Sequence, residues 1–73
     1  MELIYRDLAN YCTQVIDDFE LRVKSALSDI DSNRCTLQYA DYSLYSDIQN
    51  AVYDYCLDNN IEYDSIDIES IIY

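Results

Sequence analysis

The side chains that could do chemistry in this sequence are carboxylates and thiols. The 73 residues include 15 Asp and Glu, three Cys and nine Tyr, but no His. Without an imidazole, neither a serine nor a cysteine has the base that most often activates it. Cys12 and Cys56 fall on apolar helical positions, so we expect buried structural thiols. Catalytic carboxylate pairs need a cleft that separates their pKa values, and a domain this small has little room for one. We therefore expect no enzyme.

The acid-rich C-terminal segment invites a test for metal binding. Its spacing partly matches an EF-hand calcium loop at Asp58, Asn60, Glu62, Asp64 and Glu69. The sixth position of such a loop needs glycine for its sharp turn, and Tyr63 stands there. Zinc has less support, because there is no histidine and no CxxC pair. We expect neither a metal nor a cofactor.

The charge is strongly negative and unevenly distributed. The net charge is −11, and the four bases Arg6, Arg22, Lys24 and Arg34 all lie in the first 34 residues. Residues 35–73 hold eight acids and no base, a net charge of −8. Direct binding of nucleic acid requires clustered Lys and Arg, so this class of function is excluded. No apolar run is long enough for a membrane span.

An apolar fraction of 51% nevertheless predicts a folded chain, which we take as one domain over 1–73. Apolar residues recur at steps of three and four, which predicts a long amphipathic helix over about 2–31. The residues of this apolar period are Ile4, Leu8, Cys12, Val15, Phe19, Val23, Ala26 and Ile30. The pairs Glu2–Arg6, Asp18–Arg22 and Glu20–Lys24 have the favourable helical spacing and should neutralise three cations locally. The turn formers at 31–33 end this helix.

A second helix is expected over about 46–58, with a capping box at Ser46 and Gln49 and a stop at Asn59-Asn60. Residues 35–40 show weak alternation and predict a short extended segment. Residues 61–73 fit either a strand or a helical turn, and we favour the turn. The fold class is therefore mainly α, with α+β containing a small two-stranded sheet as the alternative.

The second helix places acids along one flank. Asp47, Asp54 and Asp58 fall within about 40° of one another on a helical wheel, separated by roughly 10 and 6 Å along the axis. The shorter interval is about one phosphate step along a DNA strand. An ordinary solvated helix face would produce the same stripe. The charge favours a function for it, because solubility alone needs only about 2–8 net charges on a small domain.

Tyrosines are interleaved with these acids, as in Asp41-Tyr42-Ser43-Leu44-Tyr45-Ser46-Asp47 and Tyr53-Asp54-Tyr55. In size, charge and this interleaving the chain resembles the DNA-mimic inhibitors of phages and plasmids, among them anti-restriction proteins, uracil-DNA glycosylase inhibitors and some anti-CRISPR proteins. Those proteins share no single fold, and no motif aligns with them. The resemblance implies competitive occlusion of a DNA- or RNA-binding site and a phage or mobile-element origin.

We therefore expect an inhibitor that binds a basic nucleic-acid-binding protein, such as a host defence or repair enzyme, in the cytoplasm, where the three thiols stay reduced. An acidic adaptor whose charge serves solubility is the alternative, and a homodimer built on the first helix is a third option. The candidate partner-binding residues are Asp41, Tyr42, Tyr45, Asp47, Tyr53, Asp54, Asp58, Glu62, Asp64, Asp67 and Glu69.

Overall fold

The computed structural model describes the backbone of residues 2–73 and the side chains from residue 4 onwards. Four α-helices follow one another, and two 3-10 turns complete the chain: α1 (Glu2–Val15), α2 (Phe19–Asn33), α3 (Leu37–Ala40), α4 (Tyr42–Asn59), η1 (Tyr63–Ser65) and η2 (Ile68–Ile71). None of the described residues forms a strand. The prediction of a mainly α fold is confirmed, and the alternative with a small sheet is wrong.

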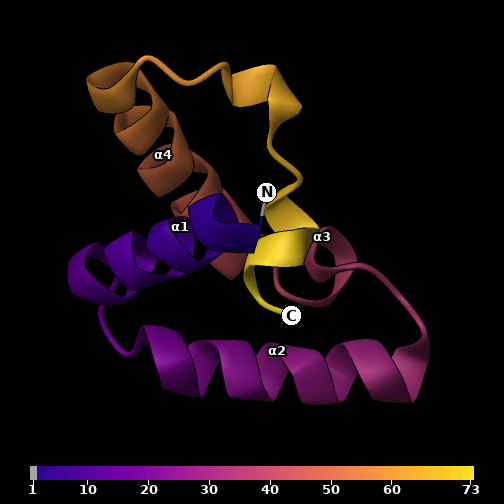
Figure 1. Cartoon of the computed structure of the whole chain (residues 1–73). Coiled ribbons are helices and arrows are strands. Elements are labelled where there is room, and N and C mark those ends of the chain that lie inside the picture. The colour runs from indigo at the N-terminus through magenta and orange to yellow at the C-terminus, as the bar shows by residue number, and fades with distance from the viewer. Residues whose placement is uncertain (1) are drawn as a thin grey trace.

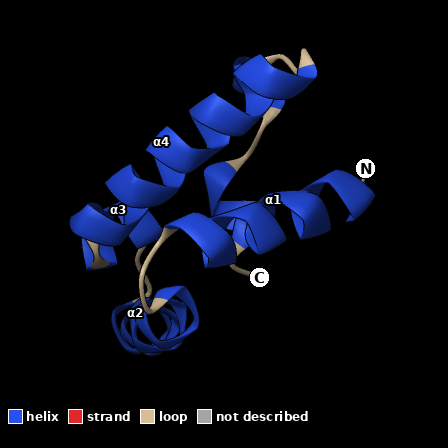
Figure 2. Ribbon diagram, turned by 90° about the vertical axis from the view of Figure 1, so that its left-hand side faces the viewer, coloured by secondary structure: helices blue, strands red, loops and turns tan. Residues whose placement is uncertain are grey.

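One apolar cluster joins all four helices and the C-terminal segment. Helix α2 runs along one edge of the molecule (Figure 1) and is seen end-on below α1 and α4 in Figure 2. The segment after α4 returns across the molecule, so that η2 packs on both α1 and α4. The fully buried side chains are Leu8, Cys12, Leu37, Leu44, Ile48 and Val52.

The single long helix expected over about 2–31 is wrong, because the chain breaks at residues 16–18 into α1 and α2. A straight helix of that length would measure about 45 Å, whereas the longest dimension of the molecule is 36 Å. Asp18 adopts a left-handed conformation (φ 56°) that turns the chain. The turn buries Ile16 and leaves Val15 exposed, although the helical period had placed Val15 in the core.

Helix α4 begins four residues before the predicted start at residue 46. Its N-cap is Asp41, whose side-chain Oδ1 accepts a hydrogen bond from the Leu44 backbone N–H at 3.0 Å. The capping box expected at Ser46 and Gln49 is therefore wrong, since both residues lie inside the helix. The earlier start adds Leu44 to the buried face of α4.

Residues 35–40 do not form the expected extended segment. Thr36 is extended, but Leu37–Ala40 make one helical turn, α3, with Leu37 buried and Tyr39 exposed. The C-terminal residues form two 3-10 turns, which confirms the helical alternative for 61–73.

Left-handed residues end two of the helices without glycine. Asn60 (φ 55°) closes α4 as expected, and its N–H bonds to the Cys56 carbonyl. Arg34 (φ 50°) closes α2 in the same way. Asparagine tolerates this conformation better than most residues, whereas arginine has no such advantage.

Candidate protein-binding surface

The eleven predicted partner-binding residues occupy two settings in the structure. The acids at the start and in the first half of α4 and around η2 have carboxylates that the fold itself uses, and Tyr45 packs against the core. The acids in the second half of α4 and around η1 are exposed, and their carboxylates have no bonding partner among the described residues. Tyr42 and Tyr53 are both more than half exposed.

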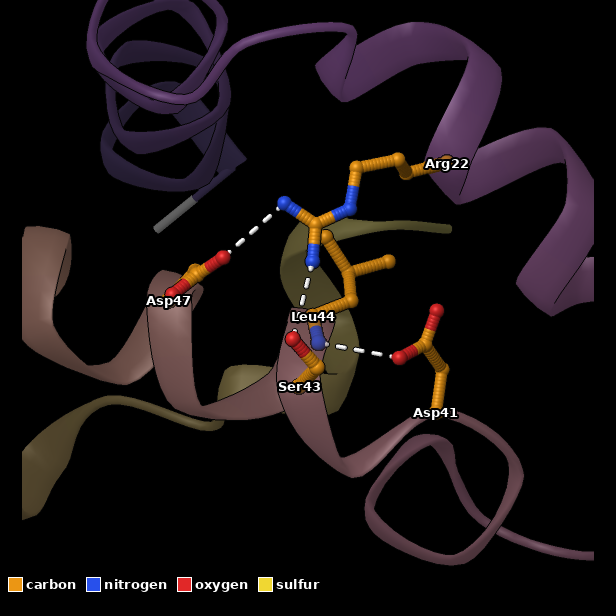
Figure 3. A network of polar contacts seen from close by, with 5 residues as sticks. All are labelled: Arg22, Asp41, Ser43, Leu44 and Asp47. Carbon is orange, nitrogen blue, oxygen red and sulfur yellow. Dashed lines mark hydrogen bonds and ion pairs between the residues drawn. The ribbon is translucent and has the colours of Figure 1, made fainter.

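The first half of α4 uses its acids structurally. Asp41 caps the helix, as described above. Asp47 accepts a hydrogen bond at 2.9 Å from Nη1 of Arg22 on α2, and Nη2 of the same guanidinium donates to Ser43 Oγ at 3.4 Å (Figure 3). Arg22 therefore bonds to two side chains that lie one helical turn apart on α4, and so links α2 to α4.

This interhelical contact corrects the local pairing expected for Arg22. Asp18 was expected to pair with it, but the Asp18 residue forms the turn before α2. Arg22–Asp47 is the one ion pair found among the described side chains, so Glu20 and Lys24 do not pair either. The pair expected between Glu2 and Arg6 lies outside the described side chains.

The ion pair also changes the acidic stripe predicted for this helix. The Asp47 side chain is 45% exposed and its charge is opposed by Arg22. Asp54 and Asp58 are exposed and form no hydrogen bond or ion pair with described side chains. Of the three residues in the predicted stripe, only Asp54 and Asp58 therefore have carboxylates that remain available to a partner.

A groove of about 410 Å³ lies beside the ion pair, between the α1–α2 turn and α4. Its polar walls bring three carboxylates around one guanidinium, so its local charge is negative despite Arg22. It is lined by Val15, Ile16, Asp17, Arg22, Asp47, Asn50, Ala51 and Asp54.

The second half of α4 and the following turn form what we call the outer acidic surface, made of Asp54, Asp58, Glu62 and Asp64. All four residues are exposed, and their carboxylates have no bonding partner among the described residues. Asp54 and Asp58 are like charges at i and i+4, an arrangement that destabilises a helix by about 0.2–0.5 kcal/mol. Asp58 also lies in the last turn of α4, where the helix dipole disfavours an anion. Asp54 and Asp58 therefore lie at positions where a negative charge lowers the stability of the helix.

Apolar side chains stand beside the outer acidic surface. Tyr53 and Leu57 are 52% and 63% exposed, one helical turn apart on α4. The Tyr53 ring meets the Tyr63 ring edge-on, with centroids 5.6 Å apart. The other two predicted tyrosines differ from each other: Tyr42 is 64% exposed, whereas Tyr45 packs against the core.

Asp67 and Glu69 serve the C-terminal segment itself. The Glu69 carboxylate accepts the Leu37 backbone N–H through both oxygens, at 2.9 and 3.1 Å, and so fastens η2 to the start of α3. Asp67 caps η2 by accepting from the Glu69 N–H and from Ser70 Oγ. The Asp67 N–H in turn donates to Tyr5 Oη at 3.1 Å.

Neither of the two buried thiols is placed for nucleophilic chemistry. Cys12 and Cys56 are buried, as predicted, and Cys35 is partly exposed. Burial raises the pKa of Cys12 to about 11 and also raises the pKa of Cys56. Both thiols therefore stay protonated at neutral pH and lack the thiolate that attacks a substrate. All three cysteines are free.

The described residues include no group of three or more acidic or thiol side chains placed to hold a metal ion. The segment that partly matches an EF-hand is spread over the end of α4, η1 and η2, and Glu69 at its twelfth position is bonded to Leu37. In the described part of the chain, no helix is both long and apolar enough to cross a membrane.

The roles of two residues near this surface were not predicted from the sequence. Arg22 was expected to pair with Asp18 within one helix, because the break at residues 16–18 has no glycine or proline to mark it. Leu57 was recognisable, since it falls outside the apolar period formed by Ile48, Val52 and Cys56. Its exposed position could therefore have been predicted.

No protein-family model, curated protein or solved structure matches the chain.

Proposed function

We propose that the protein is an inhibitor that presents its outer acidic surface to a basic nucleic-acid-binding site of another protein and blocks that site. The observation that supports this most directly is the arrangement of Asp54, Asp58, Glu62 and Asp64. These acids are exposed, form no ion pair or hydrogen bond through their carboxylates with the described residues, and include two positions that are unfavourable for the helix. An uninterrupted negative field of this kind steers association with a positive partner.

The row of acids that would imitate DNA phosphates is shorter than the stripe of three aspartates predicted from the sequence. Asp54 and Asp58 lie about 6 Å apart along the helix axis, close to one phosphate step of a DNA strand. Glu62 and Asp64 continue the negative charge beyond the end of α4. Tyr53 and Leu57 supply contact area, a role for which tyrosine is favoured in protein interfaces. The protein acts in the cytosol in this proposal, where Cys35 stays reduced.

The test compares two triple variants with the same change in net charge. Asp54→Asn, Asp58→Asn and Glu62→Gln neutralise the outer acidic surface; Asp7→Asn, Asp29→Asn and Asp31→Asn neutralise exposed acids on α1 and α2. Proteins captured from a lysate by the wild type are identified, purified and titrated against both variants, with and without duplex DNA.

We expect the first triple variant to lose at least tenfold in affinity and the second to retain most of it. Duplex DNA should displace the protein from its target, and binding should weaken steeply between about 0.1 and 0.5 M salt because the interacting charges are screened. A target that binds both variants equally, tolerates the higher salt and is not displaced by DNA would contradict inhibition by mimicry. It would instead favour an adaptor whose charge serves solubility.

A further inference from the structure

The outward face of α4 carries a mostly exposed apolar ridge, of which Tyr53 also meets the Tyr63 ring. Tyr53 and Leu57 lie one helical turn apart and are more than half exposed, while Ile48 and Val52 on the opposite side of the helix are fully buried. Single exposed apolar residues are ordinary on protein surfaces. Here two of them are aligned, and the acids that follow them in sequence are aligned as well.

Asp54 and Asp58 form a second ridge parallel to the first. Each aspartate directly follows one apolar residue, so the rows 53–57 and 54–58 run side by side at a spacing of about 6 Å per step. Rows of residues four apart are the ridges between which another helix packs its own side chains. The shape of this face therefore suits a helix more than a loop or a flat surface.

Charge decides what kind of helix fits this face. A second copy of the chain would bring a net charge of −11 against the same charge, and like charges across an interface oppose association. Nucleic acid and anionic lipid are repelled for the same reason. A complementary partner must carry cations opposite Asp54 and Asp58 and apolar side chains opposite Tyr53 and Leu57.

The molecule already contains one contact of this kind. Helix α2 brings the guanidinium of Arg22 to Asp47 and Ser43 on the first half of α4. Asp47 lies seven residues before Asp54, which is close to two helical turns, so both aspartates are on the same flank of α4. A partner helix would place cations against Asp54 and Asp58 as α2 places the Arg22 guanidinium against Asp47 (Figure 3).

We infer that the outer face of α4 docks a cationic amphipathic α-helix, one whose apolar stripe is bordered by Lys and Arg. This inference rests on the proposed function and deepens it by naming the element that the blocked protein presents. The acids supply attraction and orientation, while the apolar ridge distinguishes an amphipathic helix from any other cationic segment.

The test uses two synthetic peptides of about 18 residues, or five helical turns. One places Leu at helical spacing and Lys and Arg on the flanks; the other has the same composition in scrambled order. Binding to the intact protein is measured by calorimetry at about 0.15 M salt. The variants are Leu57→Gln on this face and Leu21→Gln on α2, where the leucine is 69% exposed. Circular dichroism confirms that both variants fold.

The amphipathic peptide should bind the wild type at least tenfold more tightly than the scrambled one. Leu57→Gln should remove most of this difference, and Leu21→Gln should leave it unchanged. The paired change Asp54→Asn and Asp58→Asn should weaken both peptides alike. Equal binding of the two peptides, or equal effects of the two leucine variants, would overturn the inference.

The two proposals can fail separately. A natural target that DNA displaces but that is indifferent to Leu57→Gln overturns the helix-docking face and leaves inhibition by mimicry standing. A target that depends on Leu57 and on Asp54 but is not displaced by DNA overturns mimicry and leaves the docking face standing.

Discussion

The two halves of α4 carry similar side chains and use them in opposite ways. In the first half, Leu44 is fully buried and Asp47 is paired with Arg22. In the second half, Leu57 is 63% exposed and Asp54 has no partner among the described side chains. The chain around the helix accounts for the difference. Helix α2 reaches the first half through Arg22, whereas residues 61–66 after the second half supply acids and no cation.

This comparison shows that acidity alone does not identify a binding surface. Four of the eight acids in residues 35–73 are committed to caps, an ion pair or the bond to Leu37: Asp41, Asp47, Asp67 and Glu69. The remaining four form the outer acidic surface. Of the acids in residues 35–73, only these four can meet a partner without disturbing the fold.

The largest expected effect comes from the two leucines of α4. Leu44→Ala should lower the free energy of unfolding by about 3 kcal/mol, because it removes a buried side chain and leaves a cavity. Leu57→Ala should change it by less than about 0.5 kcal/mol, since the side chain is mostly in solvent. Urea unfolding followed by far-ultraviolet circular dichroism measures both. A comparable loss for Leu57→Ala would show that the second half of α4 is covered by something in the folded protein.

A smaller effect should separate two glutamates of the C-terminal segment. Glu69→Ala removes the acceptor for the Leu37 N–H and should lower the free energy of unfolding by about 1.5 kcal/mol, the size of a hydrogen bond to a charged group. Glu62→Ala is the matched control and should stay within about 0.5 kcal/mol of wild type. Hydrogen exchange of the Leu37 amide provides a local readout, because this proton should exchange faster only in Glu69→Ala. Unchanged exchange would contradict the role given to Glu69.

Local pattern was enough to predict the helical class and much of the core. The apolar period placed Leu8, Cys12, Ala26 and Ile30 correctly, and Asn60 ended α4 where an asparagine was expected. These features depend on neighbours within one or two helical turns. They are therefore visible in the sequence.

The errors occurred where distant parts of the chain decide the structure. The break at residues 16–18 lets α1 and α2 share one core, and no glycine or proline marks it. Arg22 prefers Asp47, 25 residues away, over the acid four residues before it. Likewise, the Glu69 carboxylate reaches α3 across 32 residues. Because the acids of the predicted site were chosen by charge alone, the prediction could not separate acids that stabilise the fold from those that remain exposed.

The smallest expected effect has opposite signs in the two halves of α4. Asp47→Asn should lower the free energy of unfolding by about 0.5 kcal/mol, because it weakens an ion pair that is partly exposed and therefore screened by solvent. Asp54→Asn should raise it by about 0.3 kcal/mol, because it removes the like-charge pair with Asp58. Both differences should shrink as salt increases to about 0.5 M, where charges more than a few ångströms apart are screened. Parallel urea titrations of the two variants and the wild type at low and high salt measure these changes. If Asp54→Asn destabilised the protein as Asp47→Asn does, the Asp54 carboxylate would have a partner inside the fold, and the outer acidic surface would lose one of its four members.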